Sequence, residues 1–124
     1  MNILPIHNYI YGLYVKCAKR RNKVFNLDKI TFVSMISNVC YYCGAAGSNK
    51  AERKSYAVKV VYYNGIDRID SDGAYEKGNV VTCCKQCNAA KSDQTVEAFE
   101  SSDWLAARRK AVKAVRTCVR WNGK

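Results

Sequence analysis

Two Cys-x-x-Cys pairs constrain this chain more than any other feature of its sequence. The first pair is Cys40 and Cys43, and the second is Cys84 and Cys87. Each spacing places two sulfurs on one tight turn, and two such turns complete the tetrahedron of a four-thiolate zinc site. Gly44 follows the first pair and supplies the permissive backbone that such a turn often needs. We therefore expect one closed structural zinc site, with no open position for a substrate.

The other cysteines leave the choice of ligands partly open. Cys83 directly precedes Cys84 and could supply the sulfur in its place, but Cys84 keeps the two-residue spacing to Cys87 and we favour it. Cys17 and Cys118 lie in stretches of apolar periodicity, where we expect small core residues. The alternatives to zinc are a redox pair, disulfides or unrelated buried cysteines. A matched pair of motifs in a small basic chain favours zinc over all three.

The composition favours a single domain that binds a polyanion. A chain of 124 residues can form one modest core, to whose folding a bound metal would contribute appreciably. Lys and Arg number 21 against 10 Asp and Glu, a formal charge of +11. Four thiolates and one zinc ion would lower this to about +9. The surplus favours a nucleic-acid partner over a surface charged only for solubility. We expect no membrane partner, because no basic segment carries an exposed bulky apolar face.

Hydrophobic periodicity predicts helices near the start of the chain. Apolar residues at helical spacing predict a helix over about 6–20, and Asn26 or Asp28 can cap a second helix that ends near Asn38. Residues 45–57, with glycine, serine, asparagine and scattered charges, are typical of an exposed loop.

The β character lies between the two cysteine pairs. A strand over 59–69 and a second over 80–82 flank the turn signal Ser71-Asp72-Gly73, which predicts a hairpin. Short helices are expected at 88–91 and 96–100, and a long one from Ser102 or Asp103 to about Trp121. The expected fold class is α+β, a single domain over 1–124 with a helical part at 6–38, zinc knuckles and a ββα core at 40–92, and C-terminal helices at 95–121.

The long C-terminal helix carries a stripe of cations. Arg109, Lys113, Arg116 and Arg120 fall on one face, with few acidic residues beside them. Such a stripe is either a solvated face or a surface that follows a phosphate backbone. We expect it to bind nucleic acid without reading bases.

The segment between the cysteine pairs has a recognisable order of motifs. These are Asn-Gly-Ile-Asp-Arg-Ile-Asp at 64–70, the turn through Gly73 and Tyr75, Asn79-Val-Val, and Cys-x-x-Cys-Asn-x-x-Lys at 84–91. Together with the basic run at 19–23 and the first knuckle, they resemble the HNH endonucleases of the ββα-metal type. The resemblance is greatest to the small phage-encoded branch with zinc knuckles, and it spans roughly residues 9–100.

The resemblance implies a hairpin and a helix that hold one divalent cation, Mg²⁺ or Mn²⁺, for hydrolysis of a DNA phosphodiester. It assigns Asp67 and Asn88 to the cation and Asn79 to the hairpin loop. Arg68 would contact the scissile phosphate, which suits its forked guanidinium, and Lys91 would contact nucleic acid. Duplex DNA is the expected partner.

The expected compartment is the cytoplasm, which is the host cytoplasm for a phage-encoded protein. The sequence shows no secretory segment near Met1 and no apolar run of membrane-spanning length. A reducing compartment also suits unpaired cysteines.

One departure from the family pattern concerns the general base. The family signature begins with a histidine, usually after an Asp or His that binds metal, whereas Asp67-Arg68 stands at that place here. Aligned one way, Asp67 is the metal ligand and Arg68 replaces the base; shifted by one residue, Asp67 occupies the base position. Aspartate is a weak base near neutral pH and arginine is essentially never deprotonated. The single histidine, His7, lies far upstream and is more typical of a structural residue. A zinc-stapled nucleic-acid-binding module without catalysis is therefore the alternative to an endonuclease.

Overall fold

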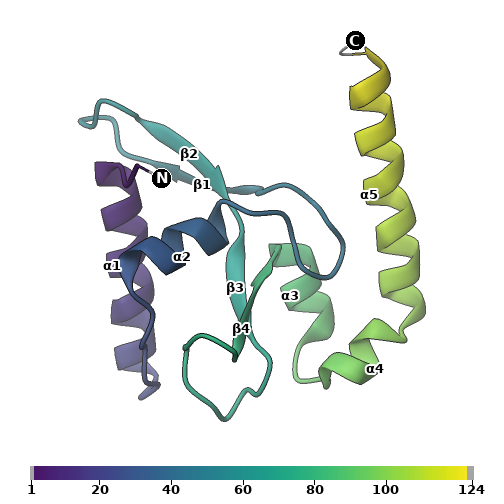
Figure 1. Cartoon of the computed structure of the whole chain (residues 1–124), viewed down its shortest axis with the longest axis horizontal. Coiled ribbons are helices and arrows are strands. Elements are labelled where there is room, and N and C mark those ends of the chain that lie inside the picture. The colour runs from purple at the N-terminus through teal and green to yellow at the C-terminus, as the bar shows by residue number, and fades with distance from the viewer. Residues whose placement is uncertain (1, 123–124) are drawn as a thin grey trace.

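The computed structural model describes the backbone of residues 2–122 and the side chains of residues 2–115. It confirms the α+β class, with helices on both sides of two small hairpins (Figure 1). The elements in chain order are α1 (Pro5–Arg20), α2 (Lys29–Ile36), β1 (Asn49–Glu52), β2 (Val60–Tyr63), β3 (Gly65–Arg68), β4 (Val80–Cys83), α3 (Lys85–Lys91), α4 (Val96–Glu100) and α5 (Asp103–Asn122).

The first two helices form an apolar core with the strands. Of the two candidate caps for α2, the structure selects Asp28, whose Oδ1 accepts from the Thr31 backbone N–H at 2.7 Å. Phe32 of α2 is fully buried and meets the rings of Tyr11 and Phe25 edge-on or tilted. This aromatic cluster holds α1 and the segment after it beside the β3–β4 hairpin.

The strands differ from the sequence prediction. The expected strand over 59–69 is divided at Asn64, and its two halves pair with different partners: β2 with β1, and β3 with β4. Asn64 is fully buried, and its Nδ2 donates to the carbonyls of Asn38 and Ala45 at 2.9 and 3.1 Å. These bonds hold the junction in place and turn the chain from one hairpin into the other.

The predicted loop over 45–57 also contains a strand, β1. Its charged residues Lys50 and Glu52 are exposed and alternate with the buried Ala51, so the segment has the pattern of a half-buried strand. Gly47 allows the approach, because a Cβ there would lie 2.5 Å from the backbone of Tyr63. The expected hairpin between the strand before residue 70 and the strand after residue 79 is present as β3 and β4, with Asp67 opposite Val81.

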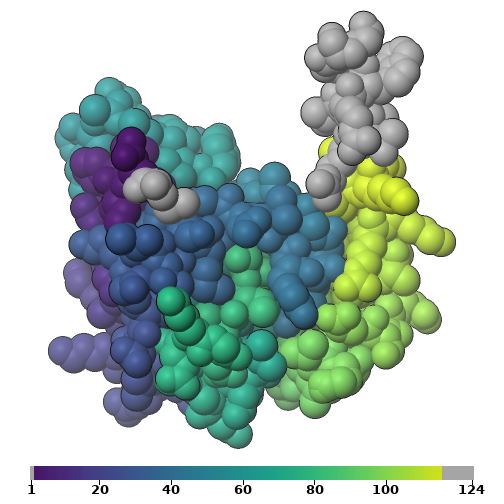
Figure 2. All heavy atoms as spheres, viewed as in Figure 1, coloured from purple at the N-terminus to yellow at the C-terminus, as the bar shows by residue number. Residues whose placement is uncertain are grey.

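A second core lies around the cysteine pairs. Phe99 of α4, with Leu105 and Val112 of α5, packs against the four knuckle cysteines and Tyr42. Through these contacts α4 and the first half of α5 close the side of the molecule opposite α1 (Figures 1 and 2). In the part of the chain that the structure describes, no helix has both the length and the apolar character needed to cross a bilayer.

The cysteines outside the pairs do not all follow the prediction. Cys17 was expected in the core but is exposed, in the last turn of α1. Cys118 lies outside the described side chains. Cys83 is buried at the end of β4.

Candidate metal centre and active-site pocket

The two Cys-x-x-Cys pairs meet in space. The Sγ atoms of Cys40, Cys43, Cys84 and Cys87 all lie within 4.8 Å of one another, and all four residues are buried. A tetrahedral site with Zn–S bonds of about 2.3 Å needs sulfurs about 3.8 Å apart. The Sγ atoms of Cys43 and Cys84 are 3.7 Å apart. Charge, donor type and spacing thus fit a structural metal such as zinc.

The backbone builds this centre from two turns. Gly44 has a φ of +81°, which confirms the expectation that a permissive residue follows the first pair. The first turn is attached to the hairpin by the Tyr41 N–H, which donates to the Thr82 carbonyl at 2.7 Å. The second turn begins α3, where the Cys84 sulfur caps the helix by accepting from the Cys87 N–H at 3.4 Å. The cluster therefore joins the segment before β1 to the hairpin and to α3.

Two neighbours adjust the charge of the cluster. The thiol of Cys83 lies outside the group of four and donates to the Cys84 carbonyl at 3.4 Å, which agrees with the choice of Cys84 as the ligand. Hydrogen bonding from the thiols of Cys83, Cys84 and Cys87 lowers the pKa of Cys40 and so favours its thiolate. Arg108 of α5 places a guanidinium nitrogen 4.0 Å from the Cys84 sulfur. A cation there suits a centre whose four thiolates exceed the charge of one zinc ion.

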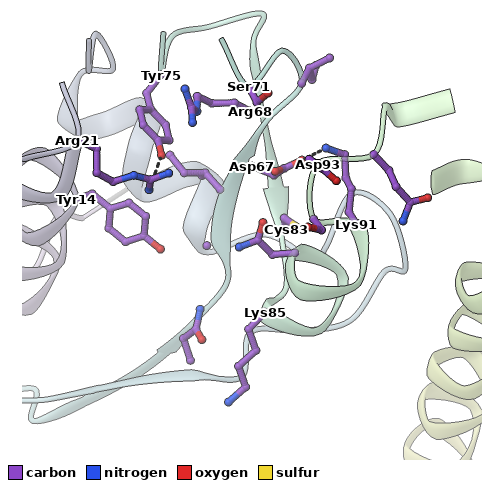
Figure 3. Close-up of a pocket in the computed structure, with 17 residues that line it drawn as sticks. Tyr14, Arg21, Asp67, Arg68, Ser71, Tyr75, Cys83, Lys85, Lys91 and Asp93 are labelled. Atoms are coloured by element: carbon purple, nitrogen blue, oxygen red, sulfur yellow. Dashed lines mark hydrogen bonds and ion pairs between the residues drawn. The ribbon is translucent and has the colours of Figure 1, made fainter. Parts of the chain in front are cut away.

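A pocket of about 500 Å³ lies beside the metal centre. Its lining comes from α1, from both strands of the β3–β4 hairpin and from α3 with the turn after it (Figure 3). Among the residues expected to act in a site, Asp67, Arg68, Asn88 and Lys91 all line this pocket.

Asp67 is held on one side of the pocket by two donors. The Lys91 ammonium lies 3.2 Å from Asp67 Oδ2, and the Tyr42 hydroxyl donates to the same oxygen at 3.1 Å. Burial, and then the charge of Asp67, raises the pKa of Tyr42, so its hydroxyl stays protonated and remains a donor. Because both donors take Oδ2, Oδ1 is the oxygen left for a further ligand among the described contacts.

Arg68 turns away from Asp67, since consecutive strand residues point to opposite faces. Its Nη1 donates to the Gly73 carbonyl at 2.9 Å, and its guanidinium lies 4.8 Å from the centre of the Tyr75 ring. These contacts fix the guanidinium at the α1 side of the pocket (Figure 3).

Asn79 ties together the loop between β3 and β4. Its Oδ1 accepts from the Asp70 N–H at 2.9 Å, and its Nδ2 donates to the carbonyls of Asp70 and Ala74 at 3.1 and 2.9 Å. Gly73 leaves room for this amide, because a Cβ there would lie 2.7 Å from Asn79 Nδ2. The Asn79 side chain therefore closes the loop that contains Gly73, whose carbonyl accepts from Arg68.

Asn88 lies in the first turns of α3, one residue after Cys87, and is exposed. It lines the same pocket as Asp67. A carboxylate and an amide oxygen are ligands that Mg²⁺ accepts together with substrate phosphates and water. Both side chains are thus of a type that a divalent cation binds, and the Lys91 ammonium already contacts one Asp67 oxygen.

Other residues expected to bind nucleic acid have different surroundings. Lys91 is not on the open surface: its side chain is 4% exposed and its charge is paired with Asp67. Arg109 is exposed, but its Nε donates to the Tyr42 carbonyl at 2.7 Å and its guanidinium lies 3.6 Å from Glu100. Lys113 is exposed on α5. Arg116 and Arg120 lie outside the described side chains.

Sequence reasoning missed several residues of the site. Tyr42 donates to Asp67, and nothing in its local sequence pattern indicates this contact. Tyr14 lies within the helix predicted over about 6–20, and the structure shows that it lines the pocket. Arg21 belongs to the basic run at 19–23, and its place in the pocket follows only from tertiary structure. His7 has a local role, because its Nδ1 accepts from the Leu4 N–H at 3.0 Å at the start of α1.

Comparison with known proteins supports the fold. The chain is similar in structure to the rare-cutting HNH restriction endonuclease PacI, with a TM-score of 0.56 over 99% of this chain and 93% of that one. The chain has the fold of an HNH endonuclease. Sequence identity to PacI is 16%, so the likeness concerns the fold alone.

Sequence relatives occur in viruses. An uncharacterized protein of Acanthamoeba polyphaga mimivirus is 33% identical over 89 residues, and an uncharacterized 29.0 kDa protein of Enterobacteria phage T4 is 35% identical over 94 residues. These matches cover 72% and 73% of this chain but only 14% and 34% of the two relatives. No family model matches the chain.

Proposed function

We propose that this protein is a metal-dependent endonuclease of the HNH type that hydrolyses phosphodiester bonds in duplex DNA. The observation that carries the proposal is the convergence of Asp67, Arg68 and Asn88 on one pocket in a chain with the HNH fold. The basic composition supports a nucleic-acid substrate.

In this proposal zinc has a structural role and lies outside the reaction. Cys40, Cys43, Cys84 and Cys87 hold the zinc, which keeps α3 in register with the hairpin. Tyr42 lies between the first two of these cysteines and reaches Asp67, so the metal centre also orients the carboxylate. Removal of zinc would therefore disturb the pocket as well as the fold.

The chain's own residues divide the work of binding and orientation. Asp67, through Oδ1, and Asn88 would hold Mg²⁺ or Mn²⁺, which when bound supplies charge neutralisation at the phosphate and the leaving oxygen. Arg68 binds a backbone phosphate, and Asn79 keeps the loop that positions it. The lining of the pocket contains no imidazole, and aspartate is a weak base. We therefore expect slow hydrolysis.

A specific observation favours the second hypothesis, a binding module without catalysis. The Lys91 ammonium neutralises Asp67, the only carboxylate of β3 that lines the pocket, and the histidine of the family signature is replaced. A site with these two features can still attract phosphates through its remaining cations.

Incubation of zinc-loaded protein with supercoiled plasmid separates the two hypotheses. With Mg²⁺ or Mn²⁺ the parent should produce nicked or linear DNA, and Asp67→Ala and Asn88→Ala should lower the rate by orders of magnitude. His7→Ala is the matched control and should cleave at nearly the parental rate, because His7 is at the far end of α1 from the Arg21 position in the pocket. Plasmid that stays supercoiled with every metal, while still bound by the protein, supports the binding module instead.

A further inference from the structure

Two arginines from distant parts of the sequence converge on Tyr75. The Arg21 guanidinium lies 3.5 Å from the Tyr75 hydroxyl, and the Arg68 guanidinium lies over the Tyr75 ring, 4.8 Å from its centre. Arg21 follows α1, whereas Arg68 ends β3. All three side chains line the pocket (Figure 3).

The backbone fixes Tyr75 in this position. Its N–H donates to the Val24 carbonyl at 2.9 Å, and its carbonyl accepts from the Asn26 N–H at 2.7 Å. These bonds form a parallel bridge between Phe25 and Tyr75, whose rings lie 5.7 Å apart. The loop between β3 and β4 is thus attached to the segment that follows α1. The fold therefore fixes the Tyr75 side chain at the place where Arg21 and Arg68 both contact it.

The charges in the pocket are unbalanced on this side. Four cations line the pocket, Arg21, Arg68, Lys85 and Lys91, against the carboxylates of Asp67 and Asp93. Lys91 is neutralised by Asp67. Among the described ion pairs, neither Arg21 nor Arg68 has a carboxylate partner. Two guanidiniums without a counter-ion, beside a cavity, favour an anionic ligand with several acceptor oxygens.

Tyr14 adds a neutral donor to the same wall. Its hydroxyl points toward the pocket (Figure 3). Burial raises the pKa of Tyr14, so the hydroxyl stays protonated and can donate to an anion.

We propose that Arg21 and Arg68, both held by Tyr75, form a subsite for one backbone phosphate of a nucleic-acid strand. The inference rests on the proposed function and adds where the strand lies: it crosses the pocket from the α1 side toward Asp67. A guanidinium pair recognises the phosphate and carries no base preference, so the subsite positions the strand without reading its sequence.

The test measures the affinity of zinc-loaded protein for a fluorescently labelled duplex over a range of salt concentrations, without added divalent cation. Arg21→Gln and Arg68→Gln should each weaken binding about tenfold. Because both side chains hold one phosphate, the slope of log affinity against log salt should be smaller in the double variant by about 0.9, the value for one contact. A loss of about 1.8 would mean two separate phosphates and would overturn the proposal, as would an unchanged slope.

Arg20→Gln is the matched control. Arg20 precedes Arg21 and carries the same charge, but it does not line this pocket, and its guanidinium lies 3.4 Å from the Cys17 sulfur. Its replacement should leave affinity and slope unchanged; a loss equal to that of Arg21→Gln would show a net-charge effect and overturn the proposal. If Arg68→Gln folds poorly without its bond to Gly73, Arg68→Lys in the Arg21→Gln background replaces it, and should bind more weakly than Arg21→Gln alone; equal affinity would overturn the proposal.

The subsite and the catalytic proposal fail separately. If the variants bind as expected but the protein cleaves no plasmid, the subsite is supported and the endonuclease hypothesis is contradicted. Metal-dependent cleavage, together with a salt slope that neither arginine substitution changes, would support the endonuclease and contradict the subsite.

Discussion

The Lys91 ammonium lies 3.2 Å from Asp67 Oδ2, and both side chains are largely withdrawn from solvent, with 4% and 12% exposed. A buried pair of this kind is costly to break from one side, because the remaining charge has no partner. It also places a cation of the protein beside the carboxylate that we propose as a ligand for a divalent metal. We therefore expect the Lys91 ammonium and the divalent metal to compete for Asp67.

Lys91→Met should therefore lower the free energy of unfolding and strengthen metal binding. Without divalent cation, the uncompensated Asp67 should cost about 3 to 5 kcal/mol in urea unfolding. Added Mn²⁺ should restore more of this loss in the variant than it adds to the parent. Lys85→Met is the control, since Lys85 lines the same pocket and is exposed. Equal Mn²⁺ effects in the parent and in Lys91→Met would contradict the competition.

Tyr42→Phe should impair the site while leaving the metal centre intact. The substitution removes the hydroxyl that donates to Asp67 but keeps the ring, which packs edge-on against Phe99 at 5.1 Å. A hydrogen bond to a charged group contributes about 1.5 to 3 kcal/mol, so cleavage should slow by roughly tenfold or more. Metal content, measured by elemental analysis, should stay at the parental value. Loss of zinc from this variant would show that Tyr42 supports the knuckle and not Asp67.

Cys84→Ser and Cys83→Ser should behave differently although the residues are adjacent. Cys84→Ser removes one of four clustered sulfurs and the cap of α3, so it should lose zinc and unfold the segment that joins the knuckles. Cys83→Ser should keep one zinc per chain, because Cys83 lies outside the cluster. Elemental analysis with thermal unfolding decides the matter. The reverse pattern would assign Cys83 as the ligand.

Stability should fall on mild acidification partly through His7. Burial lowers the pKa of His7 below its ordinary value of 6.5. The unfolded chain then takes up the proton first, so the stabilisation is complete above pH 6.5 and is lost as pH falls toward the folded pKa. His7→Gln keeps an acceptor for the Leu4 N–H and does not titrate. Its free energy of unfolding should decline less than that of the parent between pH 7 and pH 5.5, and parallel declines would exclude the contribution of His7.

The helices and the metal centre could be predicted because their signals are local. Spacing alone identified the four clustered cysteines, and a cap residue with apolar periodicity placed α2 within two residues of its observed end. The same is true of the hairpin between β3 and β4, which has a turn signal at Gly73 and a strand on either side.

The surroundings of the site could not be predicted because they depend on contacts between distant segments. Lys91 was expected to contact nucleic acid, and only the tertiary structure shows that its ammonium is paired with Asp67. The division of one apolar run into β2 and β3 depends on Asn64, whose partners lie 19 and 26 residues away. Arg21 lies in the pocket because the bridge between Phe25 and Tyr75 holds the segment after α1 beside the loop between β3 and β4. No local sequence pattern predicts this bridge.

The buried Asn64 separates the chain into regions with different tolerance for length change. The connection between β1 and β2, at residues 53–59, precedes Asn64 in the chain and is separated from Asp67 by it. Residues inserted there should project into solvent without moving Asp67. A single-residue deletion between Asn64 and Asp67 is different, because it would shift the strand by one position and turn the Asp67 carboxylate to the opposite face of the hairpin. Natural variation in length among related chains should therefore gather at the tip of the first hairpin, and the three-residue distance from Asn64 to Asp67 should be constant.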